Sequence, residues 1–428
     1  PIDFNSVYKA PSESPKARKS WDAKRLTNSQ GVIPKNIRTK ELRFAQSLPN
    51  DLNNSNLTWT AEGPFNVGGR TRALAYDVTD ENTLIAGGAS GGIWRSTDLG
   101  QSWNKMTRHF QLHNVTCIAQ DTRPGKENIW YYGTGELAGN SASGDEAYFD
   151  GNGIYKSIDN GLTWDSISST ADNNPAGSFN VFDFAWNIVL DPSNLDEDEM
   201  YMATYGSILR SVDGGESWLE EVGGGNAYYN NVDITSDGVV YATLSSDGTG
   251  KGIWRSADGM EWTNIIPDGF GNIYGRTAIG INPSNENEVY FLTAETENSG
   301  QYTNTFFGGE TWTSLWKYTY LCGNGNDTCG NWVNLSANIP ANRPTTFDNF
   351  NAQGGYDLLV KVKPDEPNVV FIGGTNLWRS TDGFTSDSNT VQIGGYFEGS
   401  DHGYGNWDIY SKHHPDQHDL LFLPSDNN

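Results

Sequence analysis

The stretch Ser211-Val-Asp213-Gly-Gly215-Glu-Ser-Trp218 decides the fold, because it recurs along the chain. Close copies begin at Ser96, Ser157 and Ser256, and a fifth copy at Ser380 loses its register after the glycine. The aspartates of the five copies are Asp98, Asp159, Asp213, Asp258 and Asp382. Each aspartate is expected to accept backbone N–H groups inside a turn, and a following glycine can adopt positive φ. The repeat therefore predicts a series of β-hairpins.

Strand-like runs surround each turn. A triplet such as Ile93-Trp94-Arg95 or Leu377-Trp378-Arg379 ends a strand before the turn, and the tryptophan after it opens the next strand. Two further runs lie upstream, for example Met200-Tyr-Met-Ala203. A disguised unit contains Leu315-Trp316-Lys317, and a longer loop replaces its turn. Four strands per repeated unit are typical of the blades of a β-propeller.

The expected fold is therefore an all-β propeller of four-stranded blades, with seven or eight blades. Residues 418–423 are interpreted as the first strand of a last blade, within which the chain stops. Residues 57–63, with Trp59, resemble an outer strand without inner strands before it. This strand is expected to pair into the last blade and close the ring. The expected domains are a basic N-terminal arm, residues 1–56, and an incomplete propeller, residues 57–428.

The charge excludes two classes of partner. The chain has 28 Lys and Arg against 53 Asp and Glu, a net charge of −25. Nucleic acid and anionic membrane surfaces would be repelled by such a body. Membrane insertion is not expected either, because the sequence has no apolar run of about 18 residues.

Three cysteines indicate the compartment. Cys322 and Cys329 lie in a Gly/Asn-rich loop that can close as a small disulfide-bonded hairpin. Such a bond favours an oxidising, extracytoplasmic location. Cys117 lies in an apolar run and is expected to be a small buried residue.

Several charged residues are candidates for ligand binding. Arg70 and Arg276 occupy matching Gly-Arg-Thr positions where inner strands begin, and inner strands line a propeller's channel. Together with Arg72 and Glu136 they form the predicted ligand-binding set, although structural ion pairing of the arginines is the alternative. The inner-strand carboxyl groups that a hydrolase could use are Glu136, Asp183, Asp233 and Asp357.

A calcium site is a further hypothesis. Asp145, Asp150 and Asn152 concentrate oxygen ligands on a Gly-rich loop, as hard cations prefer. A solvated acidic loop is the alternative. His413, His414 and His418 lie close together in the sequence, with Asp416 and Asp419. They are interpreted as a polar loop that leads into a strand, and a metal cluster is the alternative.

The repeated turns resemble the Asp-box, or bacterial-neuraminidase repeat. Two further stretches, Gly63–Ala75 and Tyr132–Ser157, are similar to the sortilin-type propellers of large exoproteins in Bacteroidetes-type bacteria. The resemblance implies a secreted or cell-surface protein, export by the type IX system and contact with that secretion machinery. It specifies the fold better than the function.

Two enzyme families share these repeats. Sialidases need three arginines around a carboxylate, but the Arg-Ile-Pro signature expected near the first strand is absent. Xyloglucan-cleaving enzymes resemble this chain around Ala89-Ser-Gly-Gly-Ile-Trp94, yet they carry a catalytic aspartate before the glycine pair, where this chain has Ala89 and Ser90.

The expected function is accordingly a non-catalytic binding or scaffold module for an extracellular protein or glycan. The alternative is a glycoside hydrolase, sialidase-like or xyloglucanase-like, acting on an extracellular polysaccharide. A hydrolase would need two carboxyl groups about 5 to 9.5 Å apart across a cleft.

Overall fold

The computed structural model describes most of the chain after residue 68. The described residues are 21, 24–34, 37–48, 69–108, 110–137, 149–172, 180–223, 225–294, 296, 300–304, 310–341, 349–398, 407–411 and 413–425. Within them the α-helix α2 (Ile37–Ser47) precedes the strands. No helix in these ranges is long and apolar enough to span a membrane.

Antiparallel sheets follow one another along the chain and form the blades. The first sheet contains β1 (Thr71–Asp77), β2 (Asp80–Gly88), β3 (Gly92–Ser96) and β4 (Asn104–Lys105). The second contains β5 (Val115–Gln120), β6 (Trp130–Thr134), β7 (Ile154–Ser157) and β8 (Asp165–Ser166). The third contains β9 (Ala185–Leu190), β10 (Met200–Thr204), β11 (Ser207–Ser211) and β12 (Leu219–Gly223). The fourth sheet contains β13 (Asn230–Ile234), β14 (Val240–Leu244), β15 (Gly252–Ser256) and β16 (Trp262–Asn264). The fifth contains β17 (Thr277–Ile281), β18 (Glu288–Ala294), β19 (Gln301–Asn304), β20 (Glu310–Tyr320) and β21 (Gly330–Asn334). The sixth contains β22 (Leu359–Val362), β23 (Val370–Gly373), β24 (Leu377–Ser380) and β25 (Thr390–Gly394).

Shorter elements connect or extend these sheets. A two-stranded hairpin follows the sixth blade, and in the described part of the chain four 3₁₀ turns lie between strands. They are β26 (Tyr396–Glu398), β27 (Trp407–Ile409), η2 (Val181–Asp183), η3 (Asp327–Cys329), η4 (Ser336–Asn338) and η6 (Gln353–Gly355).

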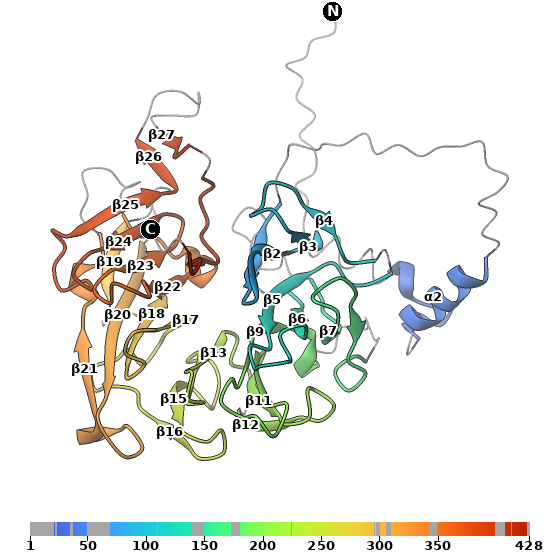
Figure 1. The fold of residues 1–428 in the computed structure, drawn as a ribbon, viewed down its shortest axis with the longest axis horizontal. Coiled ribbons are helices and arrows are strands. Elements are labelled where there is room, and N and C mark those ends of the chain that lie inside the picture. Colours follow the sequence, from blue (N-terminus) through green and yellow to red (C-terminus); the bar gives the residue numbers. More distant parts are fainter. Residues whose placement is uncertain are drawn as a thin grey trace, which may run out of the picture.

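The blades lie side by side in chain order. The innermost strands contact each other in the sequence β1, β5, β9, β13, β17 and β22, and Figure 1 shows the blades following the colour bar around an arc. The all-β propeller of four-stranded blades is confirmed. The expected number of blades is wrong: the described residues form six blades, not seven or eight.

The overcount came from residues 418–423. These residues lie beside β1 and β23 but form none of the described sheets. The side chain of Asp419, not a backbone carbonyl, accepts the N–H of Leu74 at 3.2 Å, and Phe422 packs edge-on against Phe371. The apolar run of residues 420–423 predicts a strand, but a blade also needs partners for the backbone groups of its strands. Residues 57–63 lie outside the described residues, so the closing strand and the domain boundary at residue 56 stay predictions.

The fifth blade carries the predicted disulfide. Cys322 and Cys329 are bonded, with their Cα atoms 4.6 Å apart. The bond closes the loop between β20 and β21, where the other blades have their Asp-centred turns. Cys117 is a free and buried cysteine. In this blade β20 is 11 residues long, and its first half pairs with the additional strand β19.

The Asp-centred turns join the third and fourth strands of their blades. In the turn of Asp159, the carboxylate accepts the N–H of Thr163 at 2.8 Å and the hydroxyl of Ser157 at 2.8 Å. The N–H of Gly161 donates to the Ser157 hydroxyl, and the Trp164 indole donates to the Gly161 carbonyl. The same bonds recur around Asp98 and Asp213. Each turn thus satisfies its own polar groups locally.

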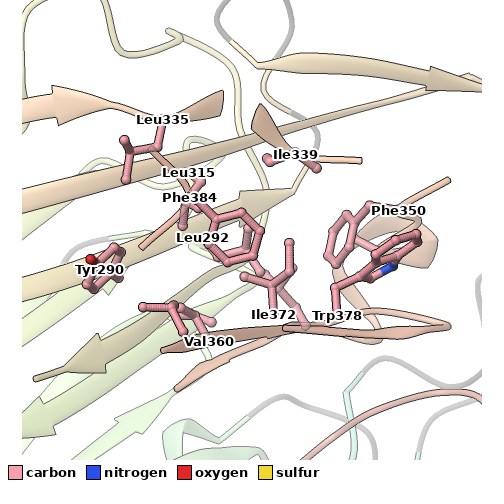
Figure 2. Packing of buried hydrophobic residues seen from close by; sticks show 14 of the residues in the cluster. Tyr290, Leu292, Leu315, Leu335, Ile339, Phe350, Val360, Ile372, Trp378 and Phe384 are labelled. Atoms are coloured by element: carbon pink, nitrogen blue, oxygen red, sulfur yellow. The ribbon is translucent and has the colours of Figure 1, made fainter. Parts of the chain in front are cut away.

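The hydrophobic core is divided into one cluster between each pair of consecutive blades. Figure 2 shows the cluster between the fifth and sixth blades, where Leu292 and Leu315 face Val360, Ile372 and Phe384. Side chains on facing sheets interdigitate and exclude water. This packing fixes the distance between blades and therefore the width of the channel.

Candidate active site at the mouth of the central channel

The two ends of the propeller differ in what they contain. Inner strands begin, and second strands end, at one end of each blade, as the pairing of Thr71 with Gly88 and of Val115 with Thr134 shows. Third strands start at this end and run away from it, so the Asp-centred turns lie at the opposite end. We call the first end the channel mouth. Its charged and aromatic residues are Arg70, Arg72, Glu136, Arg276, Tyr356, Asp357, Asp416 and His418.

Glu136 is the first centre of the mouth. It follows β6, is only 1% exposed, and accepts Arg70 Nη2 at Oε2 at 2.6 Å. Arg72 Nε lies 3.6 Å from its other oxygen. Burial raises the pKa of Glu136, and the two arginines oppose that shift. The predicted residues Arg70, Arg72 and Glu136 are thus brought together from two blades.

Tyr356 connects these residues with Arg276. Its carbonyl oxygen accepts Arg72 Nη1 at 3.4 Å and Arg276 Nη1 at 3.2 Å. The guanidinium groups of Arg70 and Arg72 lie 5.7 and 5.2 Å from the centre of its ring. Gly355 permits the approach, because its φ is +88° and an added Cβ would lie 3.0 Å from the Cβ of Arg276. All four predicted ligand-binding residues therefore surround one tyrosine.

A pair of carboxyl groups forms the second centre. Asp357 is completely buried, and its carboxyl group interacts electrostatically with that of Asp416. Burial and the charge of Asp416 raise the pKa of Asp357 well above its usual value, and burial also raises the pKa of Asp416. Two adjacent carboxylates repel each other, so a single proton on the pair is favoured over two negative charges.

His418 links the two centres. Arg72 Nη1 donates to its Nδ1 at 3.0 Å, and its Nε2 lies 3.6 Å from Asp357 Oδ1. Burial and the charges of three neighbouring arginines lower the pKa of His418 well below its usual value. The ring is therefore neutral, and the donor on Nδ1 assigns its proton to Nε2, toward Asp357.

Arg276 carries its charge in a poorly compensated position. Burial, together with the charge of Arg72, lowers its pKa to about 9. The guanidinium remains protonated at neutral pH, and it stacks 5.4 Å from the ring centre of Trp186. Arg276 is half-buried, and no carboxylate among the described residues forms a salt bridge with it, which favours an incoming oxygen ligand.

Unsatisfied polar atoms gather at the mouth. Among the described residues, the buried side-chain atoms without a hydrogen-bond partner in the protein include Arg72 Nε, Glu136 Oε1, Arg276 Nε, Gln353 Oε1, the Tyr356 hydroxyl, both oxygens of Asp357 and Asp416 Oδ1. Native proteins leave few such atoms, and those left often have a function. Asp416 also has a positive φ of 73°, a conformation that costs free energy in a residue with a Cβ. The mouth thus concentrates buried polar atoms that have no hydrogen-bond partner among the described residues.

The mouth opens into the central channel. A cavity of about 230 Å³ is lined by all six inner strands and includes Arg72, Arg276 and His418. Further lining residues are Asp233, Lys361 and Asp419. Burial raises the pKa of Asp233 and of Asp419, and Lys361 opposes both shifts.

The other predicted residues lie elsewhere. Asp183 caps the turn η2, where its Oδ2 accepts the N–H of Asn180 at 2.7 Å. Of the calcium hypothesis, Asp145 lies outside the described residues, the backbone carbonyl of Asp150 accepts the Asn114 side chain, and Asn152 is buried. No group of three potential metal ligands among His, Cys, Asp and Glu occurs in the part of the chain that the structure describes.

Sequence reasoning missed Tyr356, Asp416 and His418. The two latter residues were interpreted as part of a polar loop, because nothing local distinguishes them from one. A weak signal existed: the segment holds acidic residues and histidines immediately before an apolar run.

The fold and the site define a β-propeller with a charged channel mouth, and comparisons with known proteins narrow the class further. The chain is 27% identical over 288 residues to a xyloglucanase of Paenibacillus, which covers 58% of this chain and 26% of that enzyme. It is 25% identical over 287 residues to the xyloglucanase Xgh74A of Acetivibrio thermocellus, covering 58% of this chain and 32% of that enzyme. The chain thus spans about a third or less of the length of these relatives. No family model matches.

Solved structures support the fold. A GH74 enzyme of Niastella koreensis superimposes with a TM-score of 0.52 at 20% identity, over 82% of this chain and 53% of that one. An ancestral GH74 enzyme gives a TM-score of 0.50 at 18% identity, over 73% of this chain and 36% of that one. At such identities these likenesses show the propeller fold alone.

The relatives correct the expected function. A non-catalytic binding or scaffold module was expected because no carboxylate stands at position 89, but the curated relatives are xyloglucanases. The comparisons therefore favour the alternative, a glycoside hydrolase. Three carboxyl groups from other blades lie at the same end of the channel as Ala89.

Proposed function

We propose that this chain is a glycoside hydrolase propeller that acts on an extracellular polysaccharide of the xyloglucan type, with the channel mouth as its site. The observation that carries the proposal is the similarity to the Paenibacillus xyloglucanase. The geometry of the mouth supports it, because glycoside hydrolysis requires one protonated and one ionised carboxyl group.

The Asp357–Asp416 pair supplies the acid in this proposal. Asp357 is completely buried, whereas Asp416 is half-buried, so we assign Asp416 as the member of the pair that would contact the substrate. The proton that the pair shares would pass from Asp416 to the glycosidic oxygen as the C–O bond breaks. Asp357 is the buried partner in this proposal, and it would keep the acid Asp416 protonated near neutral pH, because two adjacent carboxyl groups are not both ionised easily.

Glu136 supplies the second carboxylate, which would take a proton from the water that attacks the anomeric carbon as the C–O bond breaks. Its ion pairs with Arg70 and Arg72 favour the charged form against the effect of burial. Arg276 and the Tyr356 hydroxyl would hold sugar oxygens, since both have buried polar atoms without a partner in the protein.

Ala89 is a departure from the xyloglucan-cleaving enzymes that the sequence resembles. Its N–H donates to the carbonyl oxygen of Arg70 at 2.9 Å, so it lies at the same end as the mouth. The catalytic aspartate of those enzymes is therefore absent from a position next to the proposed site. The mouth carboxyl groups take its place in this proposal.

Hydrolysis of xyloglucan by the chain tests the proposal. We expect release of reducing ends by the wild type, and a loss of at least 100-fold for Asp416→Asn and for Glu136→Gln. Asp159→Asn, at the opposite end of the blades, is the matched control and should retain the wild-type rate. Absence of any cleavage by the folded wild type, or equal rates for all four proteins, would contradict the assignment.

The location outside the cytoplasm is part of the proposal. The Cys322–Cys329 disulfide supports an oxidising compartment, and a polysaccharide substrate would be met there. The Asp-box resemblance, the relation to sortilin-type exoproteins and export by the type IX machinery remain inferences from sequence motifs. Detection of the protein in culture medium, and its loss when type IX export is blocked, would test them.

A further inference from the structure

A second cavity lies between the fourth and fifth blades, outside the mouth residues. It has a volume of about 440 Å³, and its lining includes Tyr229, Asp247, Tyr274, Glu310 and Trp312. Tyr229 precedes β13 and Asp247 follows β14, so the cavity opens at the same end as the mouth. Its outer wall is the first half of β20, the part of that strand that pairs with the additional strand β19. This wall exists because the fifth blade is extended.

Aromatic rings line this cavity on two sides. Trp312 packs edge-on against Tyr302 of β19, with ring centres 5.2 Å apart. Tyr229 packs at 5.3 Å against Trp186, the residue on which the guanidinium of Arg276 stacks. The row Tyr229, Trp186 and Arg276 thus connects the cavity with the channel mouth.

The polar groups of the cavity are held in place. Asp247 accepts the N–H of Tyr228 at 3.2 Å and the hydroxyl of Ser245 at 2.5 Å, and it is exposed. Glu310 accepts the hydroxyl of Tyr302 at 2.9 Å. The hydroxyl of Tyr274 is buried and has no hydrogen-bond partner in the protein. The lining therefore combines two fixed acceptors, one unused hydroxyl and two partly buried rings.

We infer that this cavity binds a neutral pyranose ring of a polysaccharide. The C–H face of a pyranose packs on aromatic rings, while its hydroxyl groups donate to carboxylates, and both kinds of group are present. The two carboxylates, on a body of net charge −25, would repel uronic or sialic acids. The volume is in the range of small-molecule sites. The inference rests on the proposed function for the source of the sugar, but binding here requires no cleavage at the mouth.

Binding of a short neutral glucan separates the two proposals. Cellotetraose and trigalacturonate would be titrated into the full chain by calorimetry. We expect the neutral oligosaccharide to bind and the uronate to bind at least tenfold more weakly. Trp312→Ala should weaken cellotetraose binding at least tenfold. Asp247→Asn should reduce the ratio between the affinity for cellotetraose and the affinity for trigalacturonate. Trp94→Ala, an exposed tryptophan on the first blade, is the control and should leave both affinities within twofold.

The mouth variants complete the design. Asp416→Asn should lower the rate of hydrolysis at least 100-fold and leave the Trp312-dependent part of the cellotetraose affinity within twofold, because Asp416 does not line the cavity. Failure of hydrolysis with intact, Trp312-dependent binding would overturn the proposed function alone. Absence of cellotetraose binding, equal affinity for the uronate, or the same affinity in a folded Trp312→Ala variant would overturn the cavity's assignment.

Discussion

Carboxyl groups behave in opposite ways at the two ends of the propeller. At the turn end, hydrogen bonds from Ser102 and Ser96 lower the pKa of Asp98 to about 2. In the turn of Asp213, hydrogen bonds from Ser217 outweigh burial, and the pKa is again about 2. At the mouth, burial raises the pKa of Glu136, Asp357 and Asp416. A carboxylate whose donors lie within four residues supports the fold, whereas one that meets only distant groups stays available for chemistry.

The arrangement of the mouth is expected to lower the stability of the fold. The turn end is locally satisfied, but the mouth concentrates buried polar atoms that the protein leaves without partners. Active sites commonly show this property, because groups arranged for a ligand are not arranged for the fold. Each of the following variants tests one side of this contrast.

The largest effect is expected at the mouth. Arg72→Met removes the ion pair of Glu136 and the donor to His418 and leaves a buried carboxylate with one partner fewer. We expect a loss of about 3 kcal/mol in the free energy of unfolding, measured with denaturant. The control is Arg95→Met on β3, which removes one bond to the Asn160 carbonyl. If both variants lose the same free energy of unfolding, the arginine at the mouth contributes no more to stability than the arginine on β3.

The disulfide should have the next largest effect. Replacing both Cys322 and Cys329 by serine removes a cross-link between residues seven positions apart in the sequence. We expect the free energy of unfolding to fall by about 2 kcal/mol, because the unfolded chain gains conformational entropy. Thermal unfolding of the double variant and of the reduced wild type should agree. Two free thiols in the non-reduced protein, detected by mass spectrometry, would count against the bond.

A single Asp-centred turn should contribute less. Asp159→Ala removes acceptors for Ser157 and Thr163, and we expect a loss of about 1 kcal/mol, since most of these bonds are near solvent. Glycan binding should not change. A variant that remains folded yet loses binding would show that the turn end takes part in function.

The pH dependence of Asp357 should be a smaller effect, because Asp357→Asn keeps the shape and polarity of the group. The pKa of Asp357 is raised in the folded state, so the wild type loses stability as pH rises above about 4, the ordinary value, toward the raised value. The asparagine variant has no proton to lose. The difference in Tm between variant and wild type should therefore grow with pH over this window. A constant difference would mean that Asp357 titrates normally.

Calcium should give the smallest effect. If the loop of Asp145 and Asp150 binds the ion, millimolar calcium should raise Tm by a few degrees through mass action. Asp150→Asn should reduce that increase, and magnesium serves as the control. A Tm that calcium does not change would remove this hypothesis.

The sequence by itself determined the architecture of the blades. Serine, aspartate, glycine and tryptophan at fixed spacing specify a turn through bonds within a few residues, so the turns and the order of strands can be predicted without tertiary information. The disulfide follows for the same reason, since its two cysteines share one loop.

Only the tertiary structure decided the number of blades and the composition of the mouth. Residues 418–423 have the pattern of a strand, but they belong to none of the sheets that the described residues form. At the mouth, Arg72 meets Tyr356 and His418 across separations of 284 and 346 residues. Such contacts, and the burial that shifts their pKa values, depend on how the blades pack around the channel, and no local pattern encodes them.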